Sequence, residues 1–163
     1  TVCVFSEEIF NAFIHSEGYR DKLLTRWDLR LLLRQLPQFR ALVSTVLEKL
    51  AHVGEPLALA AGQTLEPRDD IWYLLVEGTG SCDGQTCESG FELGCVPFAQ
   101  AMLDAFCAAT DCRLVGIARH QLQQFMTAVP QFSYLLRKYR IEQGRQDSDW
   151  LLGPVQLKEQ DHA

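Results

Sequence analysis

The sequence IWYLLVEG, from Ile71 to Gly78, decides the fold of this chain. It is a short run of β-branched, aromatic and aliphatic residues that ends on a glycine. Turn-forming residues flank it on both sides, PRDD before it and GTG at its end. A run this short and this sharply bounded is typical of a buried strand rather than of a helix. We therefore predict a central strand here.

Further short strands are predicted around this run. They cover residues 56–60, 79–82, 85–87 and 112–118, with turn residues between them. Asp83-Gly84 lies between two of the runs and predicts a tight hairpin, because both central residues of such a turn need positive φ. A two-residue turn would pair Cys82 with Gln85 and leave Cys87 opposite Gly80. Many short strands at close spacing predict a small β-roll or jelly roll over residues 51–118.

Helical periodicity dominates outside the roll. A first helix follows Ser6, with Ile9, Ala12 and Phe13 on one face, and a second runs over residues 19–36. The predicted apolar stripe of the second helix is Tyr19, Leu23, Trp27 and Leu31. Further helices are expected over residues 41–51, 119–129 and 132–139, the last with Arg137, Lys138 and Arg140 on its outside. The predicted fold class is therefore α+β, an antiparallel β-roll or jelly roll with helices segregated to its two ends.

Composition limits the classes of function. The chain has 163 residues, of which 47% are hydrophobic and 22% charged, which is typical of a globular protein. The net charge of −6 argues against nucleic-acid binding. No apolar run is long enough to insert into a membrane, and the first residues do not resemble a signal peptide. We expect a cytoplasmic location, either free or in the cytosolic part of a membrane-associated protein.

Residues that could carry catalysis or bind metal are scattered. The six cysteines form no C-x-x-C pair, so we expect reduced thiols packed as small apolar groups. A metal-dependent jelly-roll enzyme would need histidines on neighbouring strands. Instead they fall on predicted helices, helix ends or the tail: His15, His52, His120 and His162. We therefore expect no catalytic residues, no metal and no cofactor, and predict that the chain is not an enzyme.

An internal similarity indicates a multidomain parent. A shift of 113 positions, from Val4 to Ile117, overlays the N-terminal pattern on the C-terminal helices. We expect residues 1–36 to be a helical segment that ends a preceding copy of the same domain. Residues 37–145 would be the domain itself, and residues 146–163 a tail. The chain begins without methionine, which agrees with a piece of a tandem array.

Four segments in order resemble the cyclic-nucleotide-binding domain family of kinase regulatory subunits, gated channels and bacterial transcription regulators. They are AGQTL at residues 61–65, DDIWYLLVEG at 69–78, SGFELG at 89–94 and AATDCRLVGI at 108–117. The resemblance covers roughly residues 35–145. It implies a β-roll with a phosphate-binding segment between two of its strands, and helices after the roll that move when the pocket fills.

The binding positions depart from that family. The resemblance places the degenerate cassette at Leu93, Gly94, Cys95, Phe106, Cys107 and Ala108. The ribose-binding glutamate falls on Cys95, and the phosphate-binding arginine on Phe106 or Cys107. No lysine or arginine lies between Arg68 and Arg113. A lost bidentate contact to phosphate costs on the order of a thousandfold in affinity. We therefore expect no cyclic-nucleotide binding.

The apolar segment from Phe98 to Phe106 has two interpretations at this point. It forms a helix whose side chains fill the vacated pocket, or it borders a small apolar cavity for a lipid-like or aromatic ligand. The composition, which is rich in alanine and large apolar residues, fits both.

The predicted function is a non-catalytic regulatory or interaction module within a larger protein, such as a transporter or a secretion component. Its partner would be another protein or a neighbouring domain of the same chain. By resemblance, the docking face is Phe132, Leu135, Leu136 and Tyr139. The alternative is the ligand-sensing half of a bacterial transcription regulator, although the chain carries no helix-turn-helix pattern.

Overall fold

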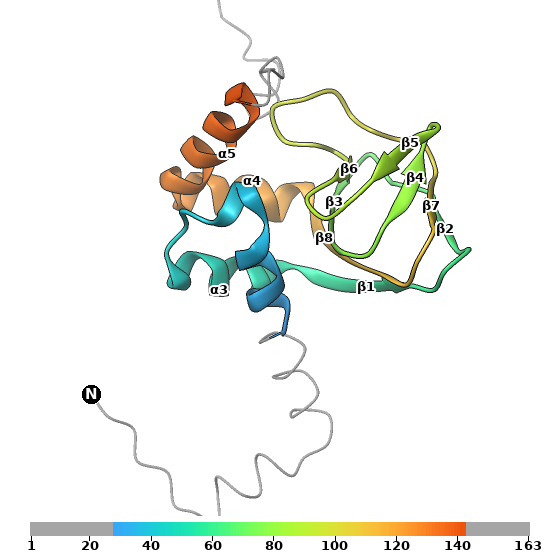
Figure 1. Ribbon diagram of the computed structural model, residues 1–163. Helices are drawn as coiled ribbons and strands as arrows, with labels where there is room; N and C mark the ends of the chain where they lie inside the picture. Colours follow the sequence, from blue (N-terminus) through green and yellow to red (C-terminus); the bar gives the residue numbers. More distant parts are fainter. Residues whose placement is uncertain (1–27, 143–163) are drawn as a thin grey trace, which may run out of the picture.

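The computed structural model describes residues 28–142, which form a group of helices packed against one side of a β-roll (Figure 1). Residues 28–35 are helical. The other elements follow in chain order: η1 (Pro37–Phe39), α3 (Ser44–Val53), β1 (Glu55–Leu59), β2 (Thr64–Leu65), β3 (Ile71–Glu77), β4 (Gly80–Cys82), β5 (Gln85–Cys87), β6 (Glu92–Gly94), β7 (Phe106–Ala108), β8 (Cys112–Ala118), α4 (Arg119–Ala128) and α5 (Pro130–Glu142). The predicted α+β class is confirmed.

The roll consists of two four-stranded antiparallel sheets, with strand orders β1-β8-β3-β6 and β2-β7-β4-β5. The predicted hairpin is confirmed together with its register, since Cys82 pairs with Gln85 and Gly80 with Cys87. Its turn residues Asp83 and Gly84 have φ of 48° and 73°. The central strand β3 lies between β8 and β6, as its continuous apolar sequence requires.

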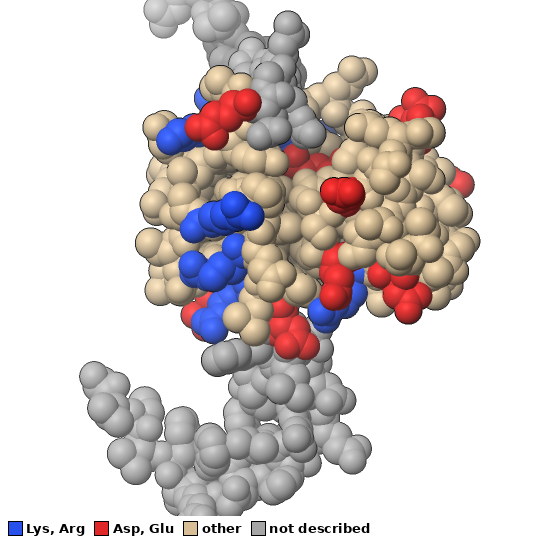
Figure 2. Space-filling model, viewed as in Figure 1, with Lys and Arg blue, Asp and Glu red and all other residues tan. Residues whose placement is uncertain are grey.

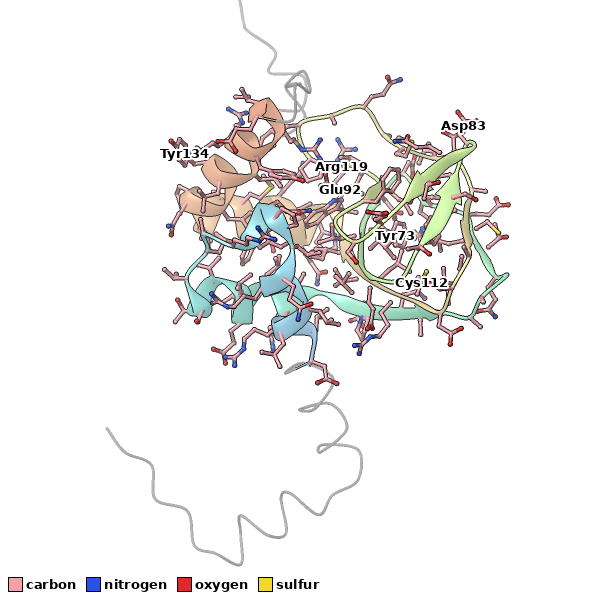
Figure 3. All side chains as sticks on the ribbon, viewed as in Figure 1. Tyr73, Asp83, Glu92, Cys112, Arg119 and Tyr134 are labelled. Atoms are coloured by element: carbon pink, nitrogen blue, oxygen red, sulfur yellow. The ribbon has the colours of Figure 1, made fainter. Side chains whose placement is uncertain are left out.

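Alternation along β3 divides the interior into two apolar clusters. Trp72, Leu74 and Val76 face the helices, where they pack with residues of α3, α4 and α5. Tyr73 and Leu75 point into the roll and pack against side chains of the opposite sheet. Figure 3 shows Tyr73 and Cys112 inside the roll. The first group is the helix-side core, and the second is the roll interior.

The helix over residues 28–35 packs on the helix-side core through Leu29 and Leu33. Leu31 is 49% exposed, so the predicted stripe that included it is wrong for this residue. The buried side chains, Leu29 and Leu33, lie two residues before and after Leu31, because a different face of the helix packs on the core. The other stripe residues, the first predicted helix and the N-terminal half of the internal similarity lie outside the described residues. The domain boundaries stay a prediction.

The structure differs from the sequence-based prediction in two further respects. It contains three strands that were not predicted, β2, β6 and β7, each of which has only two or three residues and shows no periodicity. The helix expected from Phe98 to Phe106 is absent: residues 95–105 form turns and a single bridge. Phe98 has φ of 56°, which a right-handed helix does not allow.

Charge is divided between the two halves of the molecule. Figure 2 shows most of the lysines and arginines of this face over the helices, and most of the carboxylates over the roll.

Within residues 28–142, none of the helices has the length and hydropathy needed to cross a bilayer.

Candidate functional site: the segment between β6 and β7

The segment between β6 and β7 occupies the place that the resemblance gives to a phosphate-binding cassette. Gly94 and Met102 form two backbone hydrogen bonds, with N···O distances of 2.7 and 2.9 Å. This bridge closes the intervening residues into a loop. Phe98, at the turn of the loop, is fully buried in the helix-side core.

Four backbone amides of this loop, those of Cys95, Val96, Ala99 and Met102, donate to carbonyls of the chain. The amide of Cys95 donates to the Ile71 carbonyl at 2.9 Å, and that of Val96 donates to Gly94 at 3.0 Å. Helix N-termini bind anions because several amides there point at the ligand without an internal partner. With no helix between residues 95 and 105, this loop lacks that arrangement.

The two positions that the resemblance gives for the phosphate-binding arginine lie on opposite sides of β7. Phe106 is fully buried and belongs to the roll interior, whereas Cys107 is exposed on the opposite side of β7. The Phe106 ring lies so close to Gly80 on the paired strand β4 that a Cβ at Gly80 would overlap it. The inward position therefore holds an aromatic ring packed against backbone, and its volume is taken.

Cys95, at the position of the family's glutamate, is buried in the helix-side core. Burial raises the pKa of its thiol to about 11, although the positive charge of Arg119 acts in the opposite direction. The group is therefore a neutral thiol at physiological pH. A thiol cannot accept two hydrogen bonds from a ribose as a carboxylate can.

The other described cysteines are mostly buried as well. Cys82, Cys87 and Cys112 are free thiols in the roll interior, which confirms the expected packing of reduced cysteines there. Burial raises the pKa of Cys87 to about 11 and also raises that of Cys82. Cys107 is free but exposed. Over the described range, no group of three metal-ligating side chains comes together.

Sequence reasoning missed the arginines that reach this segment from the helices. Arg140 was expected on the outside of its helix, but its side chain is only 2% exposed and forms an ion pair with Glu92. Glu92 also accepts a hydrogen bond from Trp72 Nε1 at 3.0 Å. The guanidinium of Arg137 lies 4.3 Å from the centre of the Phe98 ring. The signal in the sequence was weak, since Glu92 and Arg140 are 48 residues apart.

These arginines lie on the helix side of the segment. Trp72 and Phe98, their neighbours, both belong to the helix-side core and not to the roll interior. Figure 3 shows Glu92 and Arg119 at the junction between the roll and the helices. The absence of lysine and arginine between Arg68 and Arg113 therefore does not keep guanidinium groups away from the segment, because Arg137 and Arg140 reach it from α5.

The four residues predicted as a docking face are divided on α5. Phe132 and Leu136 are buried in the helix-side core, where Phe132 stacks on Phe39 and meets Phe125 edge to face. Leu135 and Tyr139 are half-buried. Tyr134 is 65% exposed on the outer side of the helix (Figure 3). A partner role for these residues stays a prediction.

A small apolar pocket lies elsewhere. It has a volume of about 200 Å³ and lies between the helix over residues 28–35 and the strands β1, β3 and β8. Its lining residues are Leu29, Leu32, Pro56, Leu57, Ala58, Val76, Arg113 and Leu114. None of these belongs to the segment from Cys95 to Phe106, so this pocket is not the cavity that was considered there.

No protein-family model matches the sequence, and no match is found among curated proteins. Solved structures share the fold. The regulatory domain of Toxoplasma gondii PKA, crystallised with cAMP, superposes with a TM-score of 0.57 at 15% identity, over 83% of this chain and 55% of that chain. PKAR CBD2 with bound Sp-2Cl-cAMPS superposes with a TM-score of 0.52 at 15% identity, over 79% of this chain and 97% of that chain.

A third similar structure is the N-terminal domain of a transcriptional regulator from Streptomyces coelicolor A3(2). Its TM-score is 0.52 at 21% identity, over 72% of this chain and 98% of that one. These similarities agree with a roll of two antiparallel sheets accompanied by helices. The described part of the chain therefore has the fold of a cyclic-nucleotide-binding domain.

Proposed function

We propose that this chain is a non-catalytic regulatory or interaction module that has the cyclic-nucleotide-binding fold but binds no cyclic nucleotide. The observation that carries the proposal is the pair Phe106 and Cys95. An aromatic ring fills the inward position on β7, and a neutral buried thiol replaces the glutamate. Among the described residues, the arginines that approach this segment lie on its helix side, so a cyclic phosphate inside the roll would be buried as an unpaired anion, which is strongly unfavourable.

The partner in this proposal is a protein or a neighbouring domain of the same polypeptide, and it contacts the helical half. Support comes from charge: the helices carry most of the exposed arginines and lysines of the face in Figure 2. The parent would be a multidomain protein with this module in the cytoplasm, such as a transporter or a secretion component. No catalytic role is assigned to the module.

Calorimetric titration with cAMP and cGMP tests the proposal. We expect no saturable heat up to about 1 mM nucleotide, because a lost bidentate phosphate contact alone costs on the order of a thousandfold in affinity. The Toxoplasma gondii PKA regulatory domain, which was crystallised with cAMP, is the positive control. Micromolar binding of either nucleotide to this chain would overturn the proposal.

The ligand-sensing half of a bacterial transcription regulator is the second candidate. The similarity to the Streptomyces coelicolor regulator domain, of which 98% is covered, favours it. Such a sensor would act on its DNA-binding half through self-association, whereas a module of a multidomain protein would be monomeric when separated. Sedimentation equilibrium distinguishes the two, a concentration-dependent dimer favouring the sensor.

A further inference from the structure

The contact between α5 and the roll has an ionic centre inside an apolar surround. The inner face of α5 carries Phe132, Leu136 and Arg140, spaced four residues apart, so that the three side chains lie in one row. The first two are packed in the helix-side core. Arg140 ends the row and pairs with Glu92 of β6, with both side chains 2% exposed.

Glu92 links three elements through its two carboxylate oxygens. Oε2 accepts from Arg140 of α5, and Oε1 accepts from Trp72 Nε1 of β3 at 3.0 Å. Three residues before Arg140 on α5, the guanidinium of Arg137 lies over the ring of Phe98 in the loop that follows β6. Two arginines of α5 thus contact the segment between β6 and β7: Arg140 pairs with the strand β6, and Arg137 lies on the loop that follows it.

We propose that the Glu92–Arg140 pair is a latch that holds α5 on the roll without any ligand, so that α5 opens as a unit when the pair is broken. This inference rests on the proposed function, because it supplies the position of α5 that a bound nucleotide would otherwise control. A buried ion pair contributes little net stability compared with apolar packing, but a single buried charge without its partner is strongly unfavourable. The pair therefore favours two positions of α5, one in which both charges are buried together and one in which both reach water.

The arrangement also predicts where the opening stops. Within residues 28–142, the Arg140 side chain hydrogen-bonds to Glu92 of the roll, and its Nε has no hydrogen-bond partner. The strands β3 and β8, in contrast, are paired from Ile71–Ala118 to Glu77–Arg113, with one irregularity between Leu75 and Glu77. Loss of the pair should therefore free α5 and leave the roll folded.

Hydrogen exchange of the full chain tests the latch. Glu92→Gln removes the charge but keeps an acceptor for Trp72. We expect exchange of the α5 amides to accelerate at least about tenfold, with the amides of β3 and β8 unchanged. The matched control is Glu77→Gln, which removes the carboxylate from the exposed pair with Arg113 and should leave α5 exchange as it is.

Three outcomes overturn the latch: unchanged α5 exchange in Glu92→Gln, equal acceleration in α5 and β8, or the same effect from Glu77→Gln. If Glu92→Gln does not fold, the double variant Glu92→Gln/Arg140→Gln decides, because it removes the pair without leaving a buried unpaired charge, and the latch requires acceleration confined to α5. Failure of the latch is distinguishable from failure of the proposed function. Calorimetric binding of cAMP by the unmutated chain would defeat the proposed function, whatever Glu92→Gln does.

Discussion

Replacing Gly94 by alanine should lower the free energy of unfolding by about 2–5 kcal/mol, because two costs act at once. Gly94 has φ of +73°, and an L-residue with a side chain loses roughly 1–2 kcal/mol in that conformation. The new Cβ would also overlap the Ile71 carbonyl and lie 2.8 Å from the carbonyl of Arg68. Both are backbone atoms beside or within the central strand, so they cannot turn away as a side chain could. Urea unfolding measures the loss.

Gly84 provides a matched control for this substitution. It has the same φ of +73°, but a Cβ there would meet nothing within 4 Å. Gly84→Ala should therefore cost only the conformational part, about 1–2 kcal/mol. Equal losses in the two variants would show that the space around Gly94 is open, and that the segment after β6 does not have the arrangement described.

Replacing Phe106 by alanine should destabilise the domain by about 3–5 kcal/mol, the usual result of removing a buried aromatic ring. The ring is fully buried in the roll interior against Gly80 and its strand, and its loss leaves a cavity there. Thermal and urea unfolding measure the effect. The variant also bears on function, because it reopens volume at the inward position without adding a cation.

Cys107→Ala is the control for Phe106→Ala, one residue along the same strand. Its side chain is exposed, so we expect a change within about 0.5 kcal/mol. A larger loss at Cys107 than at Phe106 would mean that the strand is turned over. In that arrangement Cys107 would occupy the inward position, and the argument from a filled pocket would fail.

The sequence predicted the parts of the fold that carry strong local signals. The strands β3 and β8 are seven residues long, and the Asp83-Gly84 turn requires positive φ, so each could be located without a structure. The break predicted between the helices over residues 119–129 and 132–139 falls at Pro130, which begins α5, where its missing N–H costs nothing. Strands of two or three residues that are not joined by such a turn carry no comparable signal, which is why β2, β6 and β7 were missed.

The candidate site was predictable in residue identity but not in geometry. The absence of the arginine could be seen at Phe106 or Cys107, and that of the glutamate at Cys95. The alternation of β7, which turns Phe106 inward, depends on a pairing with β4 that lies about two dozen residues earlier in the chain. Arg140 was misplaced for a similar reason: a lone arginine on a helix is usually solvated, and only the tertiary contact with Glu92 makes burial tolerable.

Hydrogen exchange with and without about 1 mM cAMP is the measurement that meets the central claim most directly. A nucleotide present at 1,000 times its Kd would add about 4.1 kcal/mol to the stability of the folded state and would slow exchange around its site. We predict that exchange in the segment from β6 to β7 and in α5 is the same with and without cAMP. Phe106 already fills the inward position on β7, and the Glu92–Arg140 pair already joins β6 to α5. Protection of that segment and of α5 by cAMP would contradict the account.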